Sequence, residues 1–341
     1  MKTQHLAPIM ALGLLACAPL HAAPAAPSYH LLQKVVLGGE GGWDYLTVDA
    51  DARRLYVSRG THVMVVNADT YKVVGDIPNT AGVHGIAFAP KLGRGFTSNG
   101  QSNTVTIFDL KTLKPLGSAP TGDRPDAILY DPATKRVFTF NGGGNSATAI
   151  DAATGKVVGT IPLGGRPEFA ASDGRGMVYD NIEDKGEIVA IDARTLAVTH
   201  RWPLAPLGSP SGLAIDAKNR RLFAVCDGAK MAVVNADTGR VAATPAIGDG
   251  PDAAAFDPGM RLAFSSNGQD GTLTVIREAA PDSYRTAQTV PTQAGARTMA
   301  LDTKTHRVFL VTATPGPATP GAPPWRRAYV PGTFTLLVVG P

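Results

Sequence analysis

The chain has 341 residues, of which 44% are hydrophobic and 18% are charged, with 32 Lys and Arg against 28 Asp and Glu. A formal net charge of +4 is compatible with weak association with anions, but the chain lacks the Lys/Arg clusters expected of a committed nucleic-acid-binding protein. We find no helical periodicity beyond the first twenty residues, which excludes a helical fold.

Residues 1–22 have the pattern of a secretory signal peptide. Lys2 precedes an apolar run over residues 6–20, and small residues around Ala22 form a cleavage site. The run is too short, and too often interrupted by proline, to span a membrane. Cleavage would leave residues 23–28 as a short Ala/Pro lead and residues 29–341 as one domain, located in the periplasm or secreted.

A second interpretation of this N-terminus stays open. Residues 14–17 (Leu-Leu-Ala-Cys) resemble the lipobox of bacterial lipoproteins, and lipidation of Cys17 would tether the protein to a membrane. We favour cleavage after Ala22, which removes Cys17. Cys226 is then the one remaining cysteine, so no intrachain disulfide can form, and we interpret it as a small buried hydrophobic residue.

The rest of the chain repeats a unit of about forty residues seven times, and each copy predicts four short strands separated by Gly, Asp, Asn and Pro turns. In the third copy, residues 127–131 and 136–141 form the first two of these strands. Such a unit is typical of one blade of a β-propeller. The copies begin near Gly42, Gly82, Gly122, Gly165, Gly208, Gly248 and Gly295.

The last copy has strands at residues 307–311 and 333–339 but no fourth strand. Residues 30–37 have the pattern of a fourth strand, so we expect the N-terminal segment to complete the last blade. That pairing would remove the exposed edges of an open sheet. The predicted fold is an all-β, seven-bladed propeller with four-stranded blades, in a single domain.

These repeats resemble those of the YncE-like family, whose members are built from YVTN-type propeller repeats. The resemblance covers nearly the whole mature chain and implies the seven-bladed fold. For function it implies a binding platform, a scaffold or an enzyme, and also single-stranded DNA as a ligand, although the chain offers few aromatic residues beside cations for base stacking. The resemblance is carried by Tyr56-Val57-Ser58, Phe96-Thr97-Ser98-Asn99, Phe138-Thr139-Phe140-Asn141 and Phe264-Ser265-Ser266-Asn267.

One position in each copy lies five residues before the Asp, or its equivalent, that closes the first strand. Because the first strand of each blade lines the central channel, we expect these side chains to gather around one mouth of it. Carboxylates held together raise one another's pKa values unless an arginine or a cation compensates them. The positions are Asp44, His84, Asp126, Glu168, Ser211, Asp252 and Arg297.

Structural and functional interpretations of these positions both stay open. An aspartate in a proline-containing turn, such as Asp126 or Asp252, commonly bonds backbone N–H groups nearby. His84 and Glu168 depart from the repeat, which favours a functional role. The binding candidates are Asp44, His84, Asp126, Glu168, Asp252, Arg297 and Trp325.

Trp325 belongs to a Pro/Gly-rich insertion over residues 314–331 of the last blade, which also carries Arg326 and Arg327. A loop of this length is either a lid or partner contact on the channel face, or a decoration. The ends of the second strands form another set on the same face, in which asparagine is interpreted as structural. That set is Arg59, Asn99, Asn141, Asn181, Asp227 and Asn267.

The motifs of serine hydrolases, P-loop proteins, zinc peptidases and c-type cytochromes are absent from the sequence. His84 stands nearly alone on its face, so a zinc site of the usual His/Cys type lacks ligands. Hard cations prefer oxygen ligands, so the metal site that the sequence allows is Ca or Mg held by Asp126, Glu168 and Asp252.

Two function classes follow. The favoured one is a periplasmic or secreted, monomeric binding platform that engages a small molecule or a protein through its channel face. The alternative is an enzyme, because seven-bladed rings of this architecture include lactonases and lyases that use His, Glu and Arg near the channel. In a hydrolase or lyase of that kind, His84 or Glu168 would be the general base and Arg297 would stabilise an oxyanion.

Overall fold

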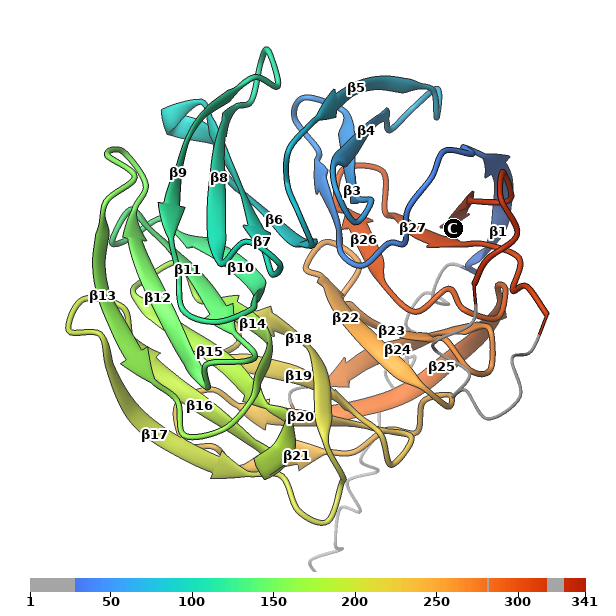
Figure 1. Cartoon of the computed structure of the whole chain (residues 1–341). Helices are drawn as coiled ribbons and strands as arrows, with labels where there is room; N and C mark the ends of the chain where they lie inside the picture. The colour runs from blue at the N-terminus through green and yellow to red at the C-terminus, as the bar shows by residue number, and fades with distance from the viewer. Residues whose placement is uncertain (1–27, 281, 318–327) are drawn as a thin grey trace, which may run out of the picture.

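A computed structural model describes residues 28–280, 282–317 and 328–341. Over these residues the chain forms seven four-stranded antiparallel sheets, arranged as blades around a central channel (Figure 1). The seven-bladed β-propeller predicted from the repeats is therefore confirmed. The only helical elements in the described ranges are two single 3₁₀ turns, Pro90–Leu92 and Glu183–Lys185.

Blades one to six follow chain order, and each runs from an inner to an outer strand. Blades one to three contain β2 (Leu46–Asp49), β3 (Arg54–Ser58), β4 (Val63–Asn67), β5 (Val73–Ile77), β6 (Val83–Ala89), β7 (Arg94–Asn99), β8 (Thr104–Asp109), β9 (Pro115–Pro120), β10 (Pro125–Asp131), β11 (Arg136–Asn141), β12 (Ser146–Asp151) and β13 (Val157–Pro162). Blades four to six contain β14 (Pro167–Ser172), β15 (Met177–Ile182), β16 (Glu187–Asp192), β17 (Ala197–Pro203), β18 (Pro210–Asp216), β19 (Arg221–Cys226), β20 (Lys230–Asn235), β21 (Val241–Ala243), β22 (Pro251–Asp257), β23 (Leu262–Asn267), β24 (Thr272–Ala280) and β25 (Ser283–Pro291).

The seventh blade joins the two ends of the described chain. It consists of β26 (Met299–Asp302), β27 (Arg307–Thr312), β28 (Thr335–Gly340) and, at its outer edge, β1 (His30–Val36). β1 runs antiparallel to β28, with His30 opposite Gly340 and Val36 opposite Thr335. The backbone groups along that edge of β28 are thus paired within the blade.

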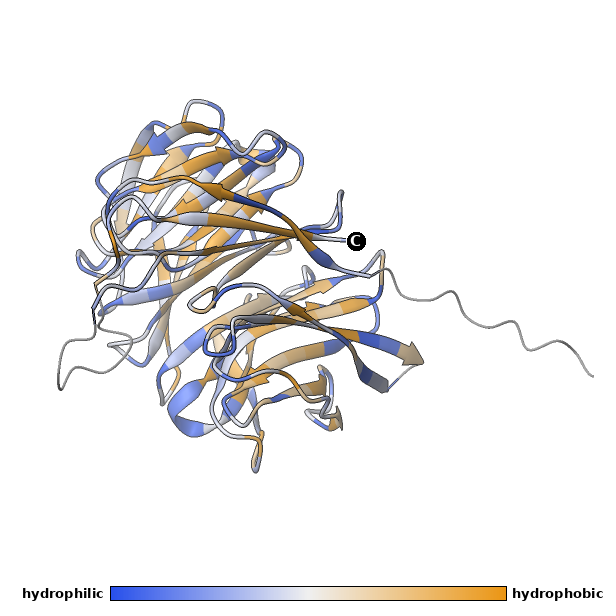
Figure 2. Ribbon diagram, turned by 90° about the vertical axis from the view of Figure 1, so that its right-hand side faces the viewer, coloured by the Kyte–Doolittle hydropathy of each residue, from blue (hydrophilic) through white to orange (hydrophobic). Residues whose placement is uncertain are grey.

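The core lies between neighbouring blades. Blade one packs Leu55 and Val57 of β3 against Phe309 and Val311 of blade seven, and similar apolar clusters fill the other blade interfaces. The two middle strands of each blade are covered on both faces, which is why they carry nearly continuous apolar side chains. Figure 2 shows hydrophobic residues concentrated on the strands and hydrophilic ones on the connecting loops.

In blades one to five, the turn after the third strand contains a threonine and is closed by the Asp or Asn that ends the strand. Asp109 accepts hydrogen bonds from the backbone N–H groups of Lys111 and Thr112, and from the Thr112 hydroxyl. The residue four positions on has a positive φ, as at Leu113 (63°) and Gly155 (72°). The apolar-Asp pattern of the repeat is therefore a turn motif that reverses the chain on the face away from the first-strand starts.

Several sequence interpretations concern residues at the ends and in the insertion. The signal peptide with Cys17, and Trp325 with its two arginines, lie outside the described residues. Cys226 is fully buried at the end of β19, and burial raises the pKa of its thiol to about 12, in agreement with a packing role. No helix in the described ranges is long and apolar enough to cross a membrane.

Candidate functional site at the channel mouth

The inner strands bring the predicted ring of side chains together. His84, Asp126, Glu168, Ser211 and Asp252 lie near the starts of β6, β10, β14, β18 and β22. Asp44 and Arg297 immediately precede the inner strands of blades one and seven. Hydrogen bonds and ion pairs connect members of the ring across neighbouring blades, so the sequence correctly predicted that these positions share one mouth.

A β-bulge at the start of the inner strand orients these side chains in blades two to six. In blade two the pairing of β6 with β7 shifts between Val83 and Ile86, so His84 falls in the unpaired stretch. The same shift occurs after the proline that begins β10, β14, β18 and β22. Bulges bend a strand and redirect a side chain. In blades three to six, a proline therefore precedes the bulged residue that belongs to the ring.

His84 lies between two carboxylates from the blades on either side. Its Nδ1 is 2.6 Å from Oδ2 of Asp44 and 3.5 Å from Oδ1 of Asp126. Gly100 borders the imidazole: a Cβ at that position would lie 2.9 Å from His84 Nε2, so glycine there leaves room for the ring. The neighbours of His84 in this cluster are carboxylates from other blades, about forty residues away in sequence.

His84 and Asp44 each stabilise the charged form of the other. Burial lowers the pKa of His84, but the hydrogen bond to Asp44 and the charge of Asp126 outweigh it, so the pKa is raised overall. Burial raises the pKa of Asp44, but His84 and Arg297 outweigh it, so that pKa is lowered overall. Both shifts favour an imidazolium–carboxylate pair in the absence of a ligand.

Arg297 connects the two sides of the ring. Its Nη1 is 2.5 Å from Oδ2 of Asp252, and its Nη2 is 3.2 Å from Oδ1 of Asp44. Asp252 also accepts a hydrogen bond of 3.0 Å from the Ser211 hydroxyl. The guanidinium therefore compensates Asp44 and Asp252, and its donors are already engaged by carboxylates.

Asp126 and Glu168 lack this compensation. Oδ1 of Asp126 is buried and has no hydrogen-bond partner within the described chain. Burial and the negative charges of Asp44 and Asp252 raise the pKa of Asp126 to about 6, although His84 opposes them. Burial, followed by the charges of Asp126 and Asp252, raises the pKa of Glu168 to about 9. At neutral pH Glu168 is therefore a neutral acid.

Aromatic rings fill the channel beside this cluster. Tyr45, which follows Asp44, and Phe169, which follows Glu168, have ring centroids 4.4 Å apart. They belong to blades one and four, on opposite sides of the ring, so their contact spans the channel. The Tyr45 hydroxyl is buried with no partner among the described residues, and burial and the surrounding carboxylates raise its pKa. The cluster thus stands at a mouth with an aromatic floor.

The structure changes the predicted set of metal ligands. Sequence reasoning grouped Asp126, Glu168 and Asp252, whereas one ligand atom each from Asp44, His84 and Asp126 lies within 4.8 Å of the others. The imidazole suits Zn²⁺ and the two carboxylates suit Mn²⁺, whereas Ca²⁺ and Mg²⁺ prefer oxygen donors alone.

The turn interpretation of the aspartates finds no support in the hydrogen bonds. Over the residues that the structure describes, the carboxylates of Asp44, Asp126 and Asp252 accept bonds from side chains or from nothing, and from no backbone N–H. These acids therefore point into the mouth and do not cap the turns.

The asparagines that end the second strands are structural, as expected. The Asn99 amide donates to the hydroxyls of Thr104 and Thr106 on the next strand, and Asn141 and Asn267 repeat this arrangement. Arg59 occupies the equivalent place in blade one but makes different contacts. The sequence analysis grouped Arg59 with these asparagines and did not predict that its surroundings differ. The replacement of asparagine by arginine at this position was the feature that could have indicated it.

The fold and the charged mouth define the class: a seven-bladed β-propeller with an ionisable cluster at its channel mouth. No family model matches the sequence, and no curated protein matches it either. The resemblance to the YncE-like family is thus not supported by a family match.

Solved structures agree on the fold. The chain superimposes on a chain of the Mitotic Checkpoint Complex with a TM-score of 0.76 at 12% identity, covering 98% of this chain and 99% of that one. For the WD40 repeats of RRP9 the TM-score is 0.74 at 10% identity, covering 93% and 99%. For Kuenenia stuttgartiensis hydrazine synthase it is 0.63 at 17% identity, covering 80% and 92%. At these identities the likeness concerns the fold alone.

Proposed function

We propose that this protein is a periplasmic or secreted binding platform whose channel mouth holds a divalent cation through Asp44, His84 and Asp126. Propellers of this fold commonly serve as protein-binding platforms. The observation that carries the cation is the convergence of the three ligand atoms within 4.8 Å, one of them an Asp126 oxygen without a hydrogen-bond partner in the described chain.

The electrostatics of the mouth support this proposal. Burial raises the pKa values of Asp126 and Glu168, and the neighbouring carboxylates raise them further. A bound cation would replace the proton on His84 and stabilise Asp126 in its ionised form. The aromatic floor limits such a ligand to the opening of the channel.

The test is calorimetric titration of the mature protein with Mn²⁺, Zn²⁺, Ca²⁺ and Mg²⁺. We expect one site that prefers Mn²⁺ or Zn²⁺ and loses at least about tenfold in affinity in His84→Ala, which removes a ligand, or in Asp126→Asn, which removes the negative charge of a ligand. His306→Asn is the matched control, because His306 pairs with Asp257 at 2.7 Å in the turn at the other end of an inner strand. Equal affinities in all three variants would contradict the proposal.

A second candidate, a lactonase-like hydrolase or lyase, rests on one observation at the same mouth. The Asp44 carboxylate orients the His84 imidazole for proton transfer, and Glu168 is a protonated acid nearby. Arg297 fits its expected role as an oxyanion donor less well, since Asp252 and Asp44 occupy its guanidinium. A lactone panel tests this candidate: turnover that survives in Glu168→Gln would exclude Glu168 from catalysis.

A further inference from the structure

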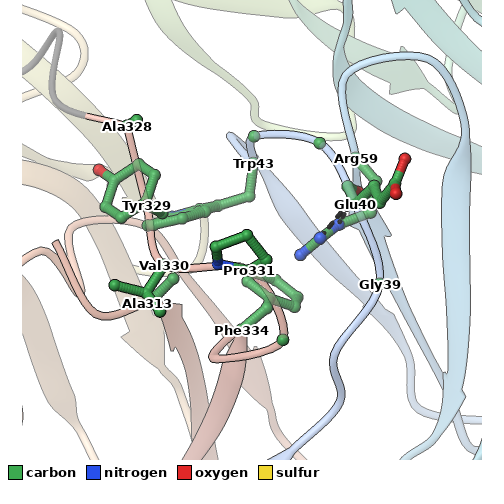
Figure 3. Close-up of a pocket in the computed structure, with 13 residues that line it drawn as sticks. Gly39, Glu40, Trp43, Arg59, Ala313, Ala328, Tyr329, Val330, Pro331 and Phe334 are labelled. Carbon is green, nitrogen blue, oxygen red and sulfur yellow. Dashed lines mark hydrogen bonds between the residues drawn. The ribbon is translucent and has the colours of Figure 1, made fainter. Parts of the chain in front are cut away.

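A cavity of about 410 Å³ opens between blades one and seven. Its described walls are the loop at residues 39–43 before β2, Arg59 at the end of β3, Ala313, and residues 328–334 before β28 (Figure 3). Small-molecule sites are commonly of this size. The cavity adjoins the channel mouth, because the carbonyl oxygen of Trp43 lies 3.4 Å from Nη2 of Arg297.

Aromatic and aliphatic side chains form most of the wall. The ring of Trp43 lies 4.5 Å from that of Tyr329 and 5.4 Å from that of Phe334, measured between centroids. Val330 and Pro331 complete this side. Tyr329 and Val330 are 39% and 40% exposed. An apolar ligand would cover them.

Arg59 is the one cationic side chain among the described lining residues, and it is only 1% exposed. Its Nε and Nη2 donate to the carbonyl oxygen of Glu40 at 3.2 and 2.8 Å, and its Cζ lies 3.5 Å from the centroid of the Phe334 ring. Its Nη1 has no partner within the described ranges. Figure 3 shows the guanidinium directed into the cavity, toward Pro331 and Phe334.

No carboxylate in the described part of the chain lies within ion-pair distance of Arg59. Burial lowers the pKa of Arg59 to about 10, so the side chain still carries its charge at neutral pH. A buried cation without a counter-charge costs free energy, and a ligand anion would supply the missing charge.

A glycine in the loop before β2 allows close packing against Arg59. Gly41 has a φ of 88°, and a Cβ there would lie 2.5 Å from the carbonyl oxygen of Arg59, so glycine lets the loop lie directly on it. Among the second-strand ends of the first six blades, an arginine occurs only in blade one. This departure from the repeat coincides with the cavity, as expected for a functional position.

We propose that this cavity binds a small organic monoanion: a carboxylate with an aromatic or branched apolar body. One cation calls for one negative charge, and Arg59 Nη1 is free to donate to a carboxylate oxygen. The indole Nε1 of Trp43, buried and without a partner in the described residues, supplies a second donor. The rings of Trp43, Tyr329 and Phe334 cover the apolar body.

The experiment titrates the full mature protein with 4-phenylbutyrate, its neutral amide and inorganic phosphate, followed by calorimetry and tryptophan fluorescence. We expect the carboxylate to bind at least about tenfold more tightly than the amide, and phosphate to show no saturable binding, since it brings more charge and no apolar body. Arg59→Gln and Tyr329→Ala should each lower the affinity for 4-phenylbutyrate by about tenfold or more. Arg124→Gln, at a side chain that is 72% exposed, is the charge-matched control and should bind as the wild type does.

Thermal unfolding of each variant separates binding from folding. Tyr329 is partly exposed on a loop, so its replacement tests the cavity even if Arg59→Gln fails to fold. Equal affinity for acid and amide, no binding of the acid at about 10 mM, or wild-type affinity in Tyr329→Ala would each overturn the proposal. None of these results bears on the cation at Asp44, His84 and Asp126, which the Mn²⁺ titration tests separately.

Discussion

At the channel mouth, the blades differ from one another at single, equivalent residue positions. The equivalent position near the start of each inner strand is Asp, His, Glu, Ser or Arg according to the blade. Counting along the repeat predicted which positions would meet. It did not predict which partners they take, because Asp44, His84 and Asp126 come from three blades and meet only once the ring is closed.

Glu168 provides a test at this scale. Its folded pKa of about 9 lies above the ordinary value of 4.5, so the stability contributed by the neutral carboxyl is full below pH 4.5 and is lost as pH rises toward 9. Glu168→Gln stays neutral and should gain on the order of 1–3 kcal/mol over the wild type at pH 8, with little difference near pH 4. Urea unfolding at both pH values measures this.

Asp192 gives the control of opposite sign. Backbone N–H groups of Thr195 and Arg194 lower its pKa, so its contribution is present above the ordinary value and is lost in acid. Asp192→Asn should therefore lose stability at pH 8 relative to pH 4. A Glu168→Gln variant whose stability relative to the wild type is the same at both pH values would show that the carboxyl ionises freely in the fold.

At the scale of strands, sequence and structure agree closely where the repeat is regular. The expected strand at residues 136–141 is β11, and the expected strand at 307–311 differs from β27 by one residue. Arg59 shows what the repeat cannot predict. Its position at the strand end followed from the repeat, but the cavity around it depends on the loop at residues 39–43 and on blade seven, which is far away in sequence.

The pairing of β1 with β28 predicts a large effect of truncation. Without residues 29–36, the edge of β28 would expose Leu336, Leu337, Val338 and Val339, all fully buried in the intact blade. We expect the melting temperature to fall by about 10 °C or more and the protein to self-associate through this edge. Scanning calorimetry and size-exclusion chromatography measure both, against a chain that begins at residue 29. A monomer with an unchanged melting temperature would contradict the role of β1.

Over the whole molecule, seven equivalent blades place their differences on one face. The opposite turns repeat the same Asp and Asn hydrogen bonds, whereas the channel face carries both the ionisable cluster and the cavity beside blade seven. Composition and repeat length specify the ring, because each blade must bury both faces against its neighbours. They do not specify the ligands, since these depend on residues that depart from the repeat.

The central claim, a divalent cation on Asp44, His84 and Asp126, is tested most directly by counting the protons released on binding. Titration of Mn²⁺ at pH 6.5 in two buffers of different ionisation enthalpy gives this number. The raised pKa values of His84 and Asp126 predict the release of about one proton per cation, reduced in His84→Ala. Binding without proton release, or no binding at all, would contradict the account.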